Sequence, residues 1–227
     1  MKRITVMLAD DHVVLCEGIR ALLQIQSDIE VVGQAANGRE AVEMAKKLSP
    51  DVVLMDIAMP GLNGLEATRQ IVLEVPSTAV LILSAYSADD YIGQMIDMGA
   101  AGYVLKQSPG NVLAQAIRDV TKGKSVFDEF VAKRVKNAGR KPGGAANAEN
   151  QPRKVHITSR EGEVLQLIAE GAANKQIASD LGISIKTVEK HRQHIMNKLK
   201  IHNTAGLTRY AIASGMVESN RLAVVTS

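Results

Sequence analysis

The stretch Val53-Leu-Met-Asp-Ile-Ala-Met-Pro-Gly-Leu-Asn-Gly64 holds one complete structural unit of this 227-residue chain. The apolar run at its start, which includes the preceding Val52 and extends to Met55, is short and continuous, as buried parallel strands are. Asp56 then stands at the carboxyl end of the expected strand, and Pro-Gly and Asn-Gly pairs mark turns. A helical pattern follows over residues 65–74. The stretch therefore predicts a strand, a turn and a helix, with a carboxylate where the strand ends.

The same unit recurs on both sides of this stretch. Further short apolar runs predict strands over 4–9, 31–35, 79–83 and 102–105, and helical patterns lie over 13–25, 38–48, 88–98 and 111–122. Five strand–helix repeats of this length predict a doubly wound α/β domain with a five-stranded parallel sheet.

Two segments follow this domain. Apolar side chains at helical spacing predict an amphipathic helix over Ser125–Lys136. Residues 139–152 are rich in Gly, Ala, Asn and Pro and have no apolar period, which is typical of a flexible linker.

From residue 157 the pattern is helical throughout. Thr158-Ser-Arg-Glu161 is a capping box that begins a helix, and Gly171 ends it. Asn174 is expected to cap a second helix, and Gly182-Ile-Ser184 makes a tight turn into a third over 185–199. A fourth helix is expected over about 204–214 and ends at Gly215. Two short helices joined by a three-residue turn with glycine predict a helix-turn-helix within an all-α, four-helix domain.

Composition excludes several classes of protein. Cys16 is the only cysteine, so a disulfide scaffold and a thiolate zinc site are excluded, and a reducing, cytoplasmic compartment is expected. Aromatic residues make up 3% of the chain, too few for a base-stacking platform. No run of apolar residues is long enough to span a membrane, and we expect no membrane partner.

Charge is distributed unevenly between the two halves. Residues 1–130 carry 11 basic and 17 acidic side chains, whereas residues 131–227 carry 16 and 7. A basic half joined to an acidic half suggests a domain that faces a polyanion, although a basic solvated surface explains the charge equally well.

Chemically active residues stand at the ends of four expected strands. Asp10 and Asp11 follow the first strand, Asp56 the third, Ser84 the fourth and Lys106 the fifth. The carboxyl ends of parallel strands converge on one crevice, where neighbouring carboxylates repel unless a hard cation such as Mg²⁺ holds them. A carboxylate nucleophile, a metal, a hydroxyl and a lysine suit a phosphoryl-acceptor site.

Two other interpretations compete with this one. Any single aspartate after a strand is usually a helix cap or turn residue, and only the joint placement favours a site. A magnesium phosphohydrolase would use the same aspartate as nucleophile. Against it, Asp56-Ile-Ala58 lacks a second carboxylate two residues on that could act as general acid and base.

The acidic pair, the 53–64 stretch, Leu83-Ser-Ala85 and Tyr103-Val-Leu-Lys106 resemble the receiver domain of two-component response regulators, over about residues 3–123. The resemblance implies a flavodoxin-like fold and a phosphoacceptor, Asp56, served by a sensor histidine kinase. It also implies a Mg²⁺ site formed by Asp11, Asp56 and the carbonyl of Ala58, with Asp10 acting through water. Ser84 and Lys106 are implied to contact the phosphoryl group, with Tyr103 as a switch residue. For Tyr103, a half-buried strand aromatic is the simpler interpretation.

The second half resembles the LuxR-type helix-turn-helix, over about residues 156–218, through Asn174-Lys-Gln-Ile-Ala178, Leu181-Gly-Ile-Ser184 and Lys186-Thr-Val-Glu-Lys-His-Arg192. The pattern of the third helix independently supports DNA binding, because Lys and Gln recur on its outer face and suit the major groove. A solvated helix face is the competing explanation. The resemblance implies base-reading residues Glu189, Lys190 and Gln193, and phosphate contacts from Lys175, Thr187, His194 and Lys198.

Together these features resemble the NarL/FixJ family of transcription regulators. We predict a receiver over 1–123, a helix and linker over 124–155, and a DNA-binding domain over 156–219. The expected partners are a histidine kinase, double-stranded DNA, RNA polymerase and, after phosphorylation, a second copy of the chain. We expect the receiver to hide the third helix until phosphorylation releases it. A regulator that binds DNA constitutively, with a weakly coupled receiver, has the same sequence features.

Overall fold

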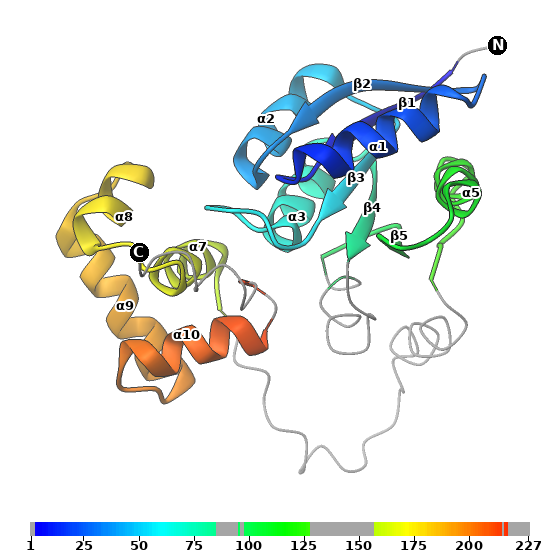
Figure 1. The fold of residues 1–227 in the computed structure, drawn as a ribbon. Coiled ribbons are helices and arrows are strands. Elements are labelled where there is room, and N and C mark those ends of the chain that lie inside the picture. Colours follow the sequence, from blue (N-terminus) through cyan, green and yellow to red (C-terminus); the bar gives the residue numbers. More distant parts are fainter. Residues whose placement is uncertain (1–2, 85–94, 96–97, 128–156, 215, 218–227) are drawn as a thin grey trace, which may run out of the picture.

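A five-stranded parallel sheet forms the centre of the N-terminal domain, as predicted (Figure 1). The computed structural model describes residues 3–84, 95, 98–127, 157–214 and 216–217. Within these, the strand order is β2-β1-β3-β4-β5, the doubly wound order of flavodoxin-like proteins. The strands are β1 (Ile4–Ala9), β2 (Ile29–Ala35), β3 (Val52–Asp56), β4 (Ala79–Ser84) and β5 (Gly102–Leu105).

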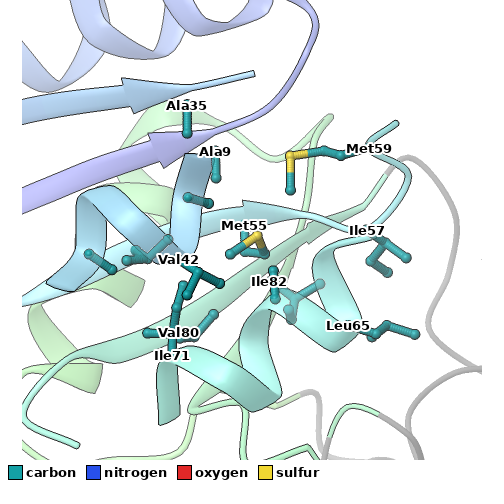
Figure 2. Packing of buried hydrophobic residues seen from close by; sticks show 14 of the residues in the cluster. Ala9, Ala35, Val42, Met55, Ile57, Met59, Leu65, Ile71, Val80 and Ile82 are labelled. Carbon is teal, nitrogen blue, oxygen red and sulfur yellow. The ribbon is translucent and has the colours of Figure 1, made fainter. Parts of the chain in front are cut away.

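Helices cover both faces of this sheet, because successive side chains of a strand point to opposite faces. From β1, Val6 and Leu8 join a core with α1 and α5, whereas Met7 and Ala9 join a core with α2 and α3. Figure 2 shows the second of these cores, in which Val42 and Ile71 pack against strand side chains. The helices are α1 (Val13–Gln24), α2 (Gly38–Leu48), α3 (Gly64–Glu74) and α5 (Gly110–Val120).

The helix predicted over Ser125–Lys136 does not begin where expected. Residues 125–127 are not helical, and Val126 instead forms an isolated bridge to Gly102. Its amide donates to the Ala101 carbonyl, and its carbonyl accepts from the Tyr103 amide. The edge of the sheet at β5 thus provides hydrogen-bond partners for the N–H and C=O groups of Val126. This long-range pairing prevails over the helical spacing of apolar residues that predicted a helix here. The remainder of the predicted helix, 128–136, lies outside the described residues.

Four helices form the C-terminal domain, also as predicted: α7 (Ser159–Ala169), α8 (Asn174–Asp180), α9 (Ile185–Leu199) and α10 (Thr204–Ala213). The capping box of Thr158 and Glu161 is present, and the Ser184 side chain caps α9. The predicted cap of α8 is wrong. Asn174 is the first residue of that helix, and its N-cap, Ala173, has no side-chain hydrogen bond.

Three predictions fall wholly or almost wholly outside the described residues. They are the helix over 88–98, of which only Met95 and Met98 are described, the linker over 139–152 and the stop at Gly215. In the part of the chain that the structure describes, no helix is long and apolar enough to cross a membrane.

The start of α3 lies very close to the end of β3, and this contact yields a test of the fold. A Cβ at Gly64 would lie 1.7 Å from the carbonyl oxygen of Asp56. We expect Gly64→Ala to lower the free energy of unfolding by about 2–4 kcal/mol, because backbone must move to accept the methyl group. Urea denaturation measures this change.

Gly18 is the matched control. It lies within α1, and a Cβ there would meet nothing within 4 Å. Gly18→Ala should leave the stability unchanged or raise it by up to about 1 kcal/mol, because alanine favours the helix. Equal stability losses in the two variants would contradict the steric explanation.

Candidate phosphoacceptor site and nucleic-acid interface

The sheet brings the predicted site residues together at its carboxyl edge. β1 and β3 are neighbours, so Asp10, which follows β1, lies beside Asp56, which ends β3. Ser84 ends β4 and Lys106 follows β5, and the Lys106 amide donates to the Ser84 carbonyl. The connections of β1 and β3 lead to opposite faces of the sheet, and ligands bind at such switch points in open α/β sheets.

The site is a buried arrangement of opposite charges. Asp10 and Asp56 are 2% and 3% exposed. The Lys106 Nζ atom lies 2.8 Å from Asp10 Oδ2 and 2.9 Å from Asp56 Oδ1. Burial alone lowers the pKa of Lys106, but the Asp56 and Asp10 carboxylates outweigh burial and raise that pKa above its ordinary value. Lys106 therefore stays protonated at neutral pH and offers a fixed positive charge beside the Asp56 oxygens.

Four side chains could hold a metal ion here. Ligand atoms of Asp10, Asp11, His12 and Asp56 all lie within 4.8 Å of one another. The His12 Nδ1 atom lies 2.9 Å from Asp10 Oδ1 and 3.3 Å from Asp11 Oδ1, although the imidazole is 54% exposed. Three carboxylates are the hard oxygen donors that Mg²⁺ prefers, so the donor set fits that ion. Ala58, whose carbonyl is a predicted ligand, is buried in the loop after Asp56.

The remaining two predicted residues lie on the neighbouring strands. Ser84 is buried at the end of β4. Tyr103 is half-buried on β5, pairs with Ile82 and packs against the core that faces α2 and α3. This is the position of an ordinary strand aromatic, and it is also one strand away from Ser84.

An apolar groove opens beside the charged site. It lies between α1 and α5, has a volume of about 510 Å³, and includes both His12 and Lys106 in its lining. Exposed apolar side chains line it, among them Val14 and Leu22, which are 83% and 46% exposed. This groove was not predicted, because sequence alone does not show which segment lies beside the exposed apolar side chains of α1.

Cys16 is a core residue. Its side chain is buried in α1, and burial together with the Asp10 carboxylate raises the pKa of the thiol to about 11. A thiol with that pKa is almost fully protonated at neutral pH and is a poor nucleophile.

In the C-terminal domain, α9 presents the predicted DNA contacts to solvent. Val188 and Ile195 point into the domain core, while the predicted base-reading residues Glu189, Lys190 and Gln193 are exposed. Of the residues predicted to contact phosphates, Lys175, His194 and Lys198 are exposed and Thr187 is half-buried.

Three of the predicted DNA contacts have hydrogen-bond partners within the domain: Thr187, Lys198 and Gln193, whose Nε2 donates to Asn197. Lys198 Nζ lies 2.6 Å from Glu161 Oε2, and Thr187 bonds to the Ser184 cap. Burial raises the pKa of Glu161, but the Lys198 and Thr158 bonds outweigh it and hold the pKa below its ordinary value. The Glu161 carboxylate therefore stays ionised and holds the Lys198 ammonium.

The expectation that the receiver hides the third helix is not met in this structure. The receiver does pack on the C-terminal domain, but it does so through α7 (Figure 1). The reason lies in the shape of the domain: α7 occupies the side that faces the receiver, whereas the outer face of α9 is turned to solvent.

The contacts between the two domains were not predicted from the sequence. Glu163, Gln166 and Glu170 on and beside α7 bond to the receiver. Their spacing of three and four residues is a signal of a shared helix face. A polar stripe of this kind is ordinarily interpreted as solvent-exposed, and nothing in its pattern identifies a second domain as its partner.

Comparison with known proteins assigns both domains. Residues 6–118 match the response regulator receiver domain, and residues 155–211 match the luxR family of bacterial regulatory proteins. The chain is 39% identical over 215 residues to the oxygen regulatory protein NreC of Staphylococcus carnosus, covering 94% of this chain and 99% of that protein. It is 40% identical over 214 residues to the transcriptional regulatory protein LiaR of Bacillus subtilis, with the same coverage.

Solved structures agree with this assignment. RcsB of Salmonella typhimurium is 26% identical, with a TM-score of 0.63 over 94% of this chain and 99% of that one. A second structure shows RcsB of Salmonella enterica serovar Typhimurium bound to the promoter rprA, with a TM-score of 0.60, 26% identity and coverage of 92% and 98%. From the two domain matches and the relatives that span nearly the whole chain, the protein belongs to the NarL/FixJ family of two-component response regulators, in which a receiver domain is joined to a LuxR-type DNA-binding domain.

Proposed function

We propose that Asp56 accepts a phosphoryl group from a sensor histidine kinase and that this transfer controls DNA binding by the C-terminal domain. The single observation that carries the proposal is the Lys106 ammonium held 2.9 Å from Asp56 Oδ1 at the edge of the sheet. In the transfer, an Asp56 carboxylate oxygen attacks phosphorus, and the P–N bond of the donor phosphohistidine breaks. Phosphoryl transfer needs mainly positioning and neutralised charge, and the buried lysine supplies charge.

Asp11, Asp56 and the Ala58 carbonyl are the proposed Mg²⁺ ligands, with Asp10 acting through water. When bound, the ion offsets the repulsion among the carboxylates and the incoming phosphoryl oxygens. Ser84 and Lys106 are proposed to contact the phosphoryl group. Tyr103 is proposed to respond to a movement of Ser84, which its half-buried position on the adjacent strand allows.

The apolar groove supports a protein as phosphoryl donor. A small phosphodonor needs only the charged site, whereas a helix of a kinase needs apolar surface beside it. The groove between α1 and α5 supplies that surface, with His12 and Lys106 in its lining. We propose that the chain works in the cytoplasm with this kinase.

We propose that the receiver accepts a phosphoryl group without acting as a phosphohydrolase. Ala58 stands where a general acid and base would be required, and its side chain has no proton to exchange. Turnover of an external phosphomonoester would contradict this.

DNA binding is proposed for α9, within domain limits of 1–123 for the receiver and 156–219 for the DNA-binding domain. Glu189, Lys190 and Gln193 are proposed to read bases, while Lys175, Thr187, His194 and Lys198 contact phosphates. The exposure of all three base-reading side chains supports this. Two phosphorylated copies are proposed to bind paired half-sites and to act on RNA polymerase.

Replacing the acceptor tests the first half of the proposal. We expect Asp56→Asn to abolish phosphoryl uptake from acetyl phosphate in Mg²⁺, because the amide is a poor nucleophile, while the fold is retained. Phosphate-affinity electrophoresis of the full chain measures the uptake.

Asp28→Asn is the control for this experiment. Asp28 lies just before β2, at the opposite edge of the sheet, where it pairs with Arg118. Normal uptake by Asp28→Asn and none by Asp56→Asn supports the assignment. Uptake by Asp56→Asn would mean that another residue is the acceptor.

Replacing a base-reading residue tests the second half. Lys190→Ala should weaken binding to the preferred duplex by at least about fivefold, because a specific base contact contributes about 1–3 kcal/mol. The preferred duplex is first selected from a randomised DNA pool, with and without acetyl phosphate. Enrichment of one motif only with the phosphodonor supports coupling, whereas equal enrichment supports the constitutive alternative.

Lys47→Ala provides the control for net charge. Lys47 is exposed on α2 of the receiver, so its loss removes the same charge far from α9. Equal weakening by the two variants would show that Lys190 acts only through the overall charge of the protein.

A further inference from the structure

One side chain of the DNA-binding domain holds the loop that follows Asp56. Gln166, on α7, is 0% exposed. Its Nε2 donates to the Met59 carbonyl at 2.8 Å, and its Oε1 accepts from the Asn63 amide at 2.9 Å. Both partners are backbone groups of the receiver, so Gln166 bonds to two points of the same loop, residues 57–63.

Neighbouring contacts fix Gln166 in place. Its Nε2 also donates to Glu170 Oε1 at 2.8 Å, and the Glu170 carboxylate accepts from the Gly61 amide at 3.2 Å. At the other end of α7, Glu163 Oε2 lies 2.9 Å from Arg39 on α2. Gln166 and Glu170 therefore hold the loop itself, whereas Glu163 bonds to α2 beside it. We call these three polar side chains of one helix face the α7 clamp: Glu163, Gln166 and Glu170.

The loop is equally constrained from the receiver side. Its first residue follows Asp56 directly, and Ile57 accepts a bond from the Gly64 amide at 2.8 Å. Gly38, at the start of α2, donates to the Leu62 carbonyl at 3.1 Å, and a Cβ on Gly38 would lie 2.3 Å from that oxygen. With close contacts on both sides, the loop has little room to change shape while α7 is docked.

We propose that Gln166 is a positioning residue for phosphorylation of Asp56: it holds the 57–63 loop in the docked shape and thereby slows phosphoryl uptake. The inference rests on the proposed function of Asp56. Any change of shape that phosphorylation imposes on the loop must break the two Gln166 bonds. By linkage, docking of α7 and phosphorylation of Asp56 then oppose each other.

This device acts without covering the DNA-reading face. The base-reading residues of α9 are exposed while the α7 clamp is closed. Control therefore lies in how the domains are held relative to each other, which sets whether two copies can place their α9 helices on paired half-sites.

The test compares full-length variants with acetyl phosphate and Mg²⁺. Gln166→Met keeps the length of the side chain and removes both bonds to the loop. We expect its maximum rate of phosphoryl uptake to rise about fivefold, the effect of losing one or two net hydrogen bonds. Small-angle X-ray scattering should show a larger radius of gyration, because the domains separate.

A second variant keeps the test informative if Gln166→Met folds poorly. Glu170→Ala removes the bond to Gly61 from a half-buried position and should raise the rate by a smaller factor. Gln176→Met is the matched control: Gln176 is exposed on α8 and bonds only within that helix to Asp180 among the contacts described. Its rate and radius should equal those of the wild type.

Each other outcome counts against the inference. An unchanged rate in Gln166→Met, with separated domains, would show that the α7 clamp holds the domains but does not affect the acceptor loop. A slower rate would show that α7 helps to arrange the loop for phosphorylation, the opposite of the proposal. No uptake by the wild-type chain would instead overturn the proposed function, and the two failures are therefore distinguishable.

Discussion

The buried ion pairs of Lys106 are the interaction on which the rest of the site depends. Asp10 and Asp56 are almost fully buried, and burying two neighbouring carboxylates is costly unless a cation lies beside them. The Lys106 ammonium, within 2.9 Å of each, offsets part of their negative charge. The parallel sheet makes this arrangement possible, because the carboxyl ends of β1, β3 and β5 lie along the same edge of the sheet.

The second constraint is that α7 packs against both the core of its own domain and the receiver. Val164, Leu165 and Ile168 pack into the core of the DNA-binding domain, while Gln166 is buried against the receiver. A helix buried on both sides cannot reorient toward one domain without consequences for the other. Asp56 and α9 are thereby connected through the 57–63 loop of the receiver and the single helix α7.

Most of the architecture could be predicted because each element carries its own local signal. β1, β5, α2 and α9 were predicted with the bounds that the structure gives them. Apart from the cap of α8, which is displaced by one residue, the errors share one cause: a competing partner lies far away in sequence. Val126 pairs with the edge of β5 although its surroundings have helical spacing, and α7 rather than α9 faces the receiver.

The chain alone specifies the two domain folds and the chemical character of both sites. The spacing of apolar residues, the turn residues and the position of aspartates after strands are local properties. Local properties can be recognised from the sequence without knowledge of the tertiary structure. Tertiary structure adds what depends on pairs of distant groups: the two ion pairs of Lys106, the apolar groove beside them, and the burial of Gln166. A glutamine in a polar stripe is indistinguishable from a solvated one until a second surface meets it, because its hydrogen bonds are satisfied equally well by water or by a backbone loop.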